Sequence, residues 1–142
     1  MIKMTMKQDG RFPFKFKFTL NGSGVVTVDW GDSSEKITLT LEGLNTFSHT
    51  YPNVSLRPIT INGDSITKLN CYSNQLTSLD VSKNTALKDL YCYNNRLTDT
   101  ALNILFRTLP CVTKGEIYVG VNPGACSCNP RIATDKGWSV LE

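Results

Sequence analysis

The chain has 142 residues, of which 40% are hydrophobic and 19% charged, and its net charge is +3. These values describe an ordinary globular protein, and its scattered lysines and arginines do not indicate nucleic acid as a partner. No apolar run approaches the roughly 20 residues that cross a bilayer, so we expect no membrane insertion.

The two ends of the chain suggest that it comes from a longer protein. Its first ten residues lack the apolar core of a signal peptide. Its last two residues, 141–142, resemble the remnant of a cloning site. We therefore expect a piece of an exported protein whose signal peptide lies outside this sequence.

Residues 1–62 predict an all-β domain. Residues 12–20 alternate apolar and polar side chains with a period of two, so their phenylalanines share one face of a strand. We expect a turn at residues 21–24 and further short strands at residues 25–30, 37–41, 47–51 and 58–61. Several short strands at this spacing favour a β-sandwich.

Three short motifs in this part resemble the polycystic-kidney-disease (PKD)-like domain of the immunoglobulin type. They are Val28-Asp29-Trp30-Gly31-Asp32, His49-Thr50-Tyr51-Pro52 and Ile59-Thr60-Ile61. The resemblance covers roughly residues 10–62. It implies a sandwich fold in which His49 has a packing role.

Asp29, Asp32 and Glu35 have two interpretations. A calcium ion needs several oxygen ligands, and one loop can supply them. Aspartate beside a Trp-Gly corner is also what a tight turn requires, because its carboxylate bonds nearby backbone groups. Since no fuller run of carboxylates follows, we favour the turn and expect no metal.

A 12-residue phrase occurs twice in the second part of the chain, with a period of 21 residues. Residues 66–77, ITKLNCYSNQLT, return as residues 87–98, LKDLYCYNNRLT. Both fit the leucine-rich-repeat signature Leu-x-x-Leu-x-Leu-x-x-Asn-x-Leu, with cysteine in the third apolar position. Such a unit forms one short strand and a return segment, and it must stack on its neighbours to bury its apolar side.

The second repeat continues differently from the first. Asp99-Thr100 is a good N-cap for a helix over residues 101–108. Residues 116–122 then align as a third strand, 27 residues after the second. A short helix at residues 130–136 and a strand at residues 138–140 complete the predicted elements.

Residues 64–140 resemble the repeat class that is abundant in surface proteins of Bacteroidetes-type bacteria. The likeness rests on the phrase LTSLDVSKNTAL at residues 76–87 and on the ending NPG, followed by IATDKGW, over residues 122–138. It implies an exported or surface-attached protein, often a binder or adhesin.

The predicted fold is therefore mixed but mostly β. A PKD-like β-sandwich over residues 1–62 acts as an N-terminal cap. It joins a short leucine-rich-repeat solenoid with a parallel sheet and a small α/β C-terminal cap, over residues 63–140. Solenoid ends need such covers to hide their apolar core.

The five cysteines do not form an obvious disulfide framework. Cys71 and Cys92 share one inward repeat position and are expected in the core as free thiols. Cys111, Cys126 and Cys128 lie outside the repeats, and a bond from Cys111 to Cys126 or to Cys128 stays open for an oxidising compartment. A zinc site is not favoured, because Cys-x-x-Cys spacing is absent and the single histidine is far away.

Asn74, Asn95 and Asn122 share another repeat position. A side-chain amide at this position can bond the backbone of neighbouring turns, which would otherwise leave polar groups unpaired. We predict that the three asparagines form a structural ladder.

Candidate ligand-binding residues alternate with the buried strand positions. If Leu69 and Cys71 point inward, then Asn70 and Tyr72 point outward. Aligning the strands, which lie ~4.8 Å apart, places Asn70, Tyr91 and Tyr118 in one row, and Tyr72, Tyr93 and Gly120 in the next. Tyrosine presents a flat apolar surface with a polar tip, which suits protein or carbohydrate ligands.

Three interpretations of this face stay open. The tyrosines form a ligand surface, or they pack on one another because tyrosine favours strands, or another domain of the longer protein covers them. Lys68, Asp89 and Glu116 occupy a further row and can tune specificity.

Catalysis is not expected, because no serine or cysteine has an identifiable base beside it and no phosphate-binding loop precedes a helix. We expect no cofactor. The predicted function is that of a monomeric, extracellular or surface-exposed binding or adhesion module for a protein or polysaccharide. Its ligand-binding residues are Asn70, Tyr72, Tyr91, Tyr93 and Tyr118. The alternative is a structural spacer or cap that has no ligand of its own.

Overall fold

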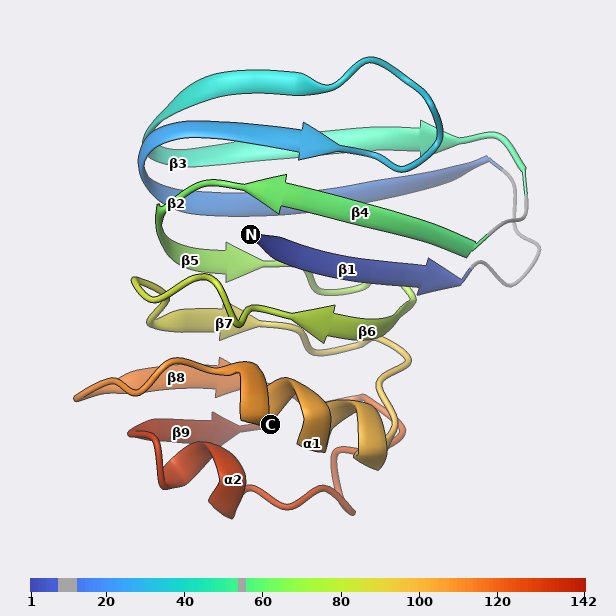
Figure 1. Ribbon diagram of the computed structural model, residues 1–142. Helices are drawn as coiled ribbons and strands as arrows, with labels where there is room; N and C mark the ends of the chain where they lie inside the picture. Colours follow the sequence, from blue (N-terminus) through green and yellow to red (C-terminus); the bar gives the residue numbers. More distant parts are fainter. Residues whose placement is uncertain (8–12, 54–55) are drawn as a thin grey trace.

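The computed structural model describes residues 1–7, 13–53 and 56–142 (Figure 1). Within these ranges the chain forms one nine-stranded sheet and two helices. The strands are β1 (Ile2–Lys7), β2 (Phe14–Asp29), β3 (Ile37–Tyr51), β4 (Leu56–Asn62), β5 (Ser65–Asn70), β6 (Leu76–Asp80), β7 (Asp89–Tyr91), β8 (Gly115–Tyr118) and β9 (Trp138–Leu141). The helices are α1 (Asp99–Thr108) and α2 (Arg131–Thr134).

The sheet curls into a half-barrel (Figure 1). Its strands follow the order β6-β1-β4-β2-β5-β7-β8-β9, and β3 pairs with β2 off this path. Parallel pairing is found between β5 and β7, β7 and β8, and β8 and β9, whereas the other pairs are antiparallel. Helix α1 contacts β6, and α2 contacts β9.

Strand β2 lies between β4 and β5 in the curled sheet and pairs with both of them. Its middle residues, 19–23, pair with β5 and its last residues, 27–29, pair with β4, while β3 pairs with almost its whole length. At the bend Gly22 lies opposite Gly43. A Cβ atom on Gly22 would lie 2.2 Å from the carbonyl oxygen of Ser65, so only glycine allows this approach.

The turn predicted at residues 21–24 is therefore wrong, as is the strand end predicted at residues 42–43. Both segments lie inside long strands, β2 and β3. A glycine within a strand can mark a bend or a close backbone approach as well as a turn, and the local sequence does not distinguish these cases. Phe12, the first residue of the predicted strand, lies outside the described residues.

The predicted fold, a β-sandwich joined to a leucine-rich-repeat solenoid, is wrong, although the mostly β character is confirmed. Strand β5 pairs with β2, and β1 pairs with β6. Backbone hydrogen bonds thus connect residues on both sides of position 62 within one sheet. Alternation along a strand reports which side is buried, whereas the pairing partner depends on contacts distant in the sequence.

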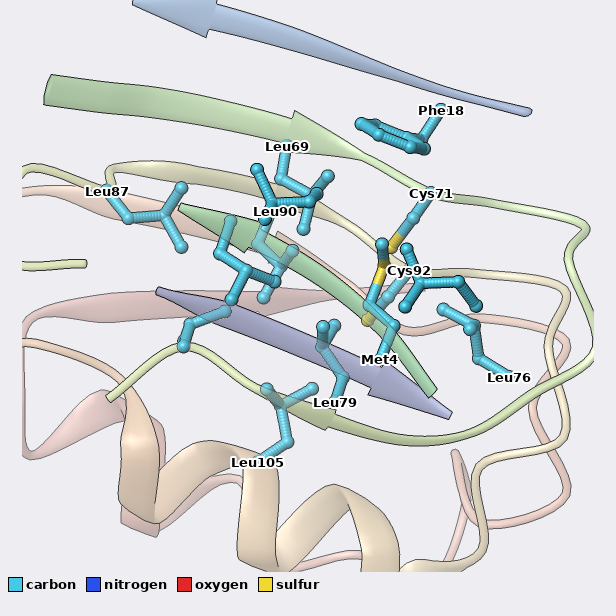
Figure 2. Packing of buried hydrophobic residues seen from close by; sticks show 14 of the residues in the cluster. Met4, Phe18, Leu69, Cys71, Leu76, Leu79, Leu87, Leu90, Cys92 and Leu105 are labelled. Carbon is cyan, nitrogen blue, oxygen red and sulfur yellow. The ribbon is translucent and has the colours of Figure 1, made fainter. Parts of the chain in front are cut away.

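The hydrophobic core fills the inner side of the curl (Figure 2). It receives Met4 from β1, Leu79 from β6, and Leu105 from α1. Cys71 and Cys92 are fully buried free thiols among these apolar side chains, as predicted. Burial raises the pKa of the Cys92 thiol to about 12, so both cysteines serve as small core residues.

Helix α1 confirms the predicted helix but begins earlier than expected. Its N-cap is Thr98, whose hydroxyl oxygen accepts a hydrogen bond from the Ala101 backbone nitrogen at 3.2 Å. The apolar face is buried as predicted, with Leu102, Leu105 and Phe106 turned to the core. The following strand, β8, ends at Tyr118, and the second helix, α2, has four residues, so both are shorter than expected.

Asn95 connects two successive turns on one side of the sheet. Its Oδ1 accepts hydrogen bonds from the backbone nitrogens of Asn74, at 2.9 Å, and Leu76, at 3.0 Å. Its Nδ2 donates to the carbonyl oxygens of Cys71, at 3.1 Å, and Cys92, at 3.0 Å. One side chain thereby satisfies four backbone groups that the turns leave without strand partners.

The other two asparagines extend this ladder in both directions. Asn122 Nδ2 donates to the Val119 carbonyl oxygen at 2.8 Å, and its Oδ1 accepts from the Leu97 nitrogen at 3.1 Å. Asn74 bonds both backbone groups of Lys17, accepting from its nitrogen at 3.0 Å and donating to its oxygen at 2.7 Å. The predicted ladder is confirmed, and Asn74 attaches it to β2.

Replacing Asn95 tests the ladder. Asn95→Ala is expected to lower the free energy of unfolding by about 3 kcal/mol, because several buried backbone groups lose their partner. Urea denaturation measures this change. The control Asn62→Ala, at an exposed position of β4, should change stability by less than about 0.5 kcal/mol. Equal effects of the two substitutions would contradict the role of the ladder.

Candidate functional site

The outer face of the sheet carries a row of side chains that crosses six strands, from β3 to β9. The strand registers place in it Thr46, Thr19, Asn70, Tyr91, Tyr118 and Leu141. The predicted alignment of Asn70, Tyr91 and Tyr118 is confirmed. The row is longer than expected because β2 and β3 extend it beyond the repeats.

The tyrosines on this face stack in two pairs. The ring centroids of Tyr91 and Tyr118 lie 4.6 Å apart with an interplanar angle of 12°. Those of Tyr72 and Tyr93 lie 4.9 Å apart with an angle of 4°. Tyr72 is 46% exposed, and the other three rings are half-buried. Tyr72 and Tyr93 therefore each use one flat face for the other ring and turn the opposite face toward a groove.

Two grooves lie side by side on this face and share Asn70. The lysine groove has a volume of about 320 Å³ and is lined by Lys15, Lys17, Thr19, Thr46, Asn70 and Tyr72, among others. The tyrosine groove has a volume of about 550 Å³, and its lining includes Lys68, Asn70, Tyr91, Tyr93, Tyr118 and Val121.

The Tyr72–Tyr93 stack separates the two grooves. Tyr72 lines the lysine groove, whereas Tyr93 lines the tyrosine groove. Because the two rings face each other, the outer face of each ring is turned to a different groove. Each groove thus has an aromatic wall.

The two grooves differ in charge. Lys15 and Lys17 are exposed, and no carboxylate in the described part of the chain pairs with either ammonium group. In the tyrosine groove, Lys68 Nζ lies 4.3 Å from the ring centroid of Tyr91, in a cation–π contact. Desolvation and the nearby Glu116 carboxylate raise the pKa of Tyr118, so its hydroxyl remains a hydrogen-bond donor at neutral pH.

The structure brings the five predicted site residues to one face, namely Asn70, Tyr72, Tyr91, Tyr93 and Tyr118. The prediction lacked Lys15, Lys17, Thr19 and Thr46, which the first part of the chain contributes. The alternation in residues 14–20 marks the two lysines as outward-facing. Their closeness to the tyrosines depends on the pairing of β2 with β5, which the local pattern does not contain.

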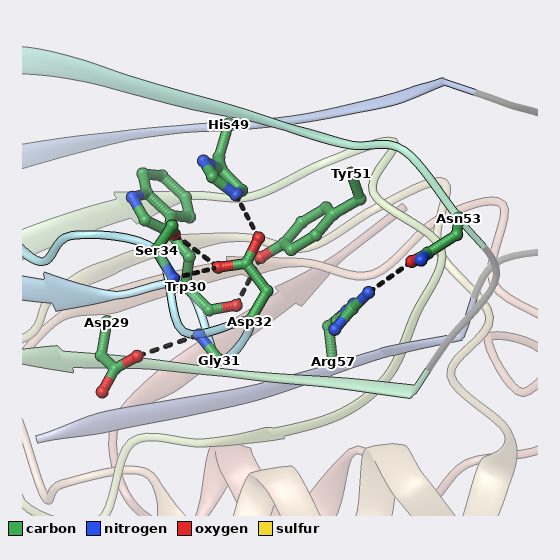
Figure 3. Close-up of polar contacts among 9 residues, drawn as sticks. All are labelled: Asp29, Trp30, Gly31, Asp32, Ser34, His49, Tyr51, Asn53 and Arg57. Atoms are coloured by element: carbon green, nitrogen blue, oxygen red, sulfur yellow. Dashed lines mark hydrogen bonds and ion pairs between the residues drawn. The ribbon is translucent and has the colours of Figure 1, made fainter.

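A second polar cluster surrounds Trp30 where β2 turns toward β3 (Figure 3). Asp29 Oδ1 accepts a hydrogen bond from the Gly31 nitrogen at 2.9 Å, and Asp32 Oδ1 accepts one from the Ser34 nitrogen at 3.1 Å. The tight turn favoured for these aspartates is confirmed. Within the described ranges, no group of three or more His, Cys, Asp or Glu side chains is placed to hold a metal ion.

Asp32 is also held by His49, whose Nε2 lies 2.6 Å from Asp32 Oδ2. The imidazole ring stacks on Trp30 at 4.9 Å, and the hydroxyl of Tyr51 donates to the Trp30 carbonyl oxygen at 2.6 Å. Although partial burial opposes ionisation, hydrogen bonds from Ser34 and His49 lower the pKa of Asp32 to about 2. These groups satisfy one another, so the cluster stabilises the corner.

The three cysteines outside the repeats are free thiols in the structure. Cys111 and Cys126 are exposed, and Cys128 is half-buried. Partial burial raises the pKa of the Cys128 thiol, which keeps it protonated at neutral pH.

Comparisons of the chain with protein families, with characterised proteins and with solved structures find no match. The resemblances noted in the sequence therefore stay predictions. In the part of the chain that the structure describes, no helix is long and apolar enough to cross a membrane.

Val121 has an unusual backbone conformation at the rim of the tyrosine groove. Its φ angle is +56°, a value that β-branched residues rarely adopt. Asn94, at the equivalent turn after Tyr93, has a φ of +53°, and asparagine tolerates this conformation. Val121 is 77% exposed, so core packing does not account for an apolar side chain at this position. Strained residues of this kind cluster at ligand sites.

Replacing Val121 tests whether the fold itself needs this residue. Val121→Asn is expected to raise the free energy of unfolding by about 1 kcal/mol, because asparagine relieves the backbone strain. Thermal unfolding measures the change. Val25→Asn, at an exposed position of β2, is the control and should not stabilise the protein. A lower stability of the Val121 variant would contradict the assignment of strain.

The Asp32 cluster predicts a loss of stability in acid. Because the pKa of Asp32 is depressed in the folded protein, its stabilising effect is complete above the unfolded pKa, near 4. It is lost as the pH falls through about 2. The stability advantage of the wild type over Asp32→Asn should therefore shrink by about 2 kcal/mol between pH 5 and pH 2. Urea denaturation at several pH values measures it, and a pH-independent difference would refute the cluster's role.

Proposed function

We propose that this chain is a non-enzymatic binding module, exposed outside the cell, that recognises a protein or a glycan through the outer face of its sheet. The observation that carries the proposal is the pair of adjacent grooves that share Asn70 and are divided by the Tyr72–Tyr93 stack. Aromatic walls beside amide, hydroxyl and ammonium groups suit a ligand that combines apolar and polar surfaces.

The dimensions of the face support an extended ligand. Neighbouring strands lie ~4.8 Å apart, so the row from β3 to β9 extends over about 24 Å. Both grooves open along this row. A ligand that follows the row would contact side chains from several strands in succession.

The rigidity of the face also supports recognition. The tyrosine rings are held by stacking, and the turns that carry Tyr72 and Tyr93 are held by the asparagine ladder. Groups that are already ordered lose little conformational entropy when a ligand binds. The face is therefore suited to binding without prior rearrangement.

The alternative function is that of a structural spacer or cap in a larger surface protein. Ring stacking within each tyrosine pair favours it, because cross-strand aromatic pairs stabilise sheets by themselves. The outer ring faces of Tyr72 and Tyr93 and the grooves beside them favour binding instead. The sequence resemblance to surface proteins of Bacteroidetes-type bacteria supports an exposed location under either proposal.

A binding screen tests the proposal. Polysaccharides and extracellular-matrix proteins are presented to the wild type and to a Tyr72→Ala, Tyr93→Ala, Tyr118→Ala variant whose cooperative unfolding shows that it is folded. We expect a ligand of the wild type whose affinity falls at least about tenfold in the variant, since aromatic anchors dominate binding energies.

Ile104→Ala is the matched control, because this exposed apolar residue lies on α1. It should leave the affinity unchanged. If no ligand binds the wild type and the tyrosine substitutions lower only stability, the spacer function is favoured.

A further inference from the structure

We propose that the lysine groove binds an acidic sugar unit, one that bears a carboxylate, within an extended polysaccharide. This inference rests on the proposed function and narrows its ligand to an anionic glycan. It depends on the charge, the aromatic wall and the backbone pairing of this groove.

The charge of the groove is positive and uncompensated. Lys15 and Lys17 alternate on β2 with buried Phe16, so both side chains leave the same face of the strand from Cα atoms about 7 Å apart. No residue that lines the groove is acidic, and no described carboxylate pairs with either lysine. Such a site is complementary to an anion.

The aromatic wall favours a ring-shaped ligand. The outer face of Tyr72 is turned to the groove, since its other face stacks on Tyr93. The apolar face of a sugar ring can pack against the outer face of the Tyr72 ring, because aromatic rings contact flat apolar surfaces well. Thr19, Thr46 and Asn70 supply hydroxyl and amide groups that can donate to and accept from sugar hydroxyls.

The backbone of the groove disfavours an acidic peptide. Peptides that bind along strands usually add to a free sheet edge. Beneath the groove β2 already pairs with β5, with Thr19 opposite Asn70. The backbone groups of Lys17 are bonded to the Asn74 side chain. Along β2 and β5 the groove therefore offers side chains rather than main-chain partners.

The position of the groove favours a chain of sugars over a single sugar. Three strand spacings, about 14 Å, separate the β2 side chains from Tyr118 on β8. The tyrosine groove continues past the Tyr72–Tyr93 wall, and its Lys68 is engaged with Tyr91. We therefore place the acidic unit over Lys15 and Lys17, and adjoining units over the tyrosine groove.

Calorimetric titration with defined polysaccharides tests this assignment. The probes are polygalacturonate and alginate oligosaccharides, together with polygalacturonate whose carboxylates have been reduced to alcohols. The wild type should bind the acidic chains, and carboxyl reduction should weaken binding at least tenfold. Lys15→Gln/Lys17→Gln should cause a similar loss and should reduce the salt dependence of binding.

The control Lys83→Gln/Lys114→Gln removes the same charge from two exposed lysines outside both grooves and should bind like the wild type. Equal loss in this control would overturn the inference, because it would indicate a general charge effect. So would tight binding of polyglutamate through the same lysines, or no binding of any acidic chain by the wild type.

Failure of the inference can be separated from failure of the proposed function. If acidic and reduced chains bind equally and only the tyrosine variant loses them, the acidic-unit assignment is wrong and the binding face stands. If wild type and tyrosine variant bind equally well, the proposed face itself is wrong.

Discussion

The backbone hydrogen bonds of β2 are the constraint on which the rest of the structure depends. This strand pairs with β5 through residues 19–23 and with β4 through residues 27–29, while β3 pairs with almost its whole length. The bend at Gly22 and Gly43 brings apolar side chains such as Phe18 and Val28 to the same inner side. Because one strand belongs to both walls, the sheet closes over its own core without a second sheet. The parallel strands β5, β7 and β8 then obtain a covered inner face and keep an accessible outer face.

The hydrogen bonds of the asparagine ladder fix the positions of side chains on the outer face of the sheet. Asn95 holds the turns after β5 and β7 through four backbone groups, and Asn74 connects the first of these turns to Lys17. The same polar ladder thus positions Tyr72 and the strand that carries the lysines. Side chains from the two halves of the chain meet in one groove because this ladder reaches β2. Val121 differs from the residues of this ladder, since its positive φ is unfavourable for a β-branched residue and its side chain is exposed.

Several features could be predicted from local patterns. The repeat register predicted the rows of tyrosines and the buried cysteines, because equivalent positions of stacked units have equivalent surroundings. The aspartates around Trp30 predicted a tight turn, because an aspartate bonds its own nearby backbone. The predicted turn at residues 21–24 and the predicted fold of a β-sandwich joined to a solenoid were wrong. A glycine-containing segment was assigned to a turn, whereas β2 and β3 pair across it. Strand β1 was not predicted, although the alternation that buries Ile2, Met4 and Met6 is present in the sequence.

The sequence by itself determined which side chains face outward and which enter the core, because alternation and repeat position are properties of neighbouring residues. It also determined that the tyrosines would share one face. Only the tertiary structure decided that Lys15, Lys17 and Thr46 would lie beside them. The physical reason is that a strand's period specifies its two faces but not its neighbours, and the pairing of β2 with β5 joins segments that are far apart along the chain.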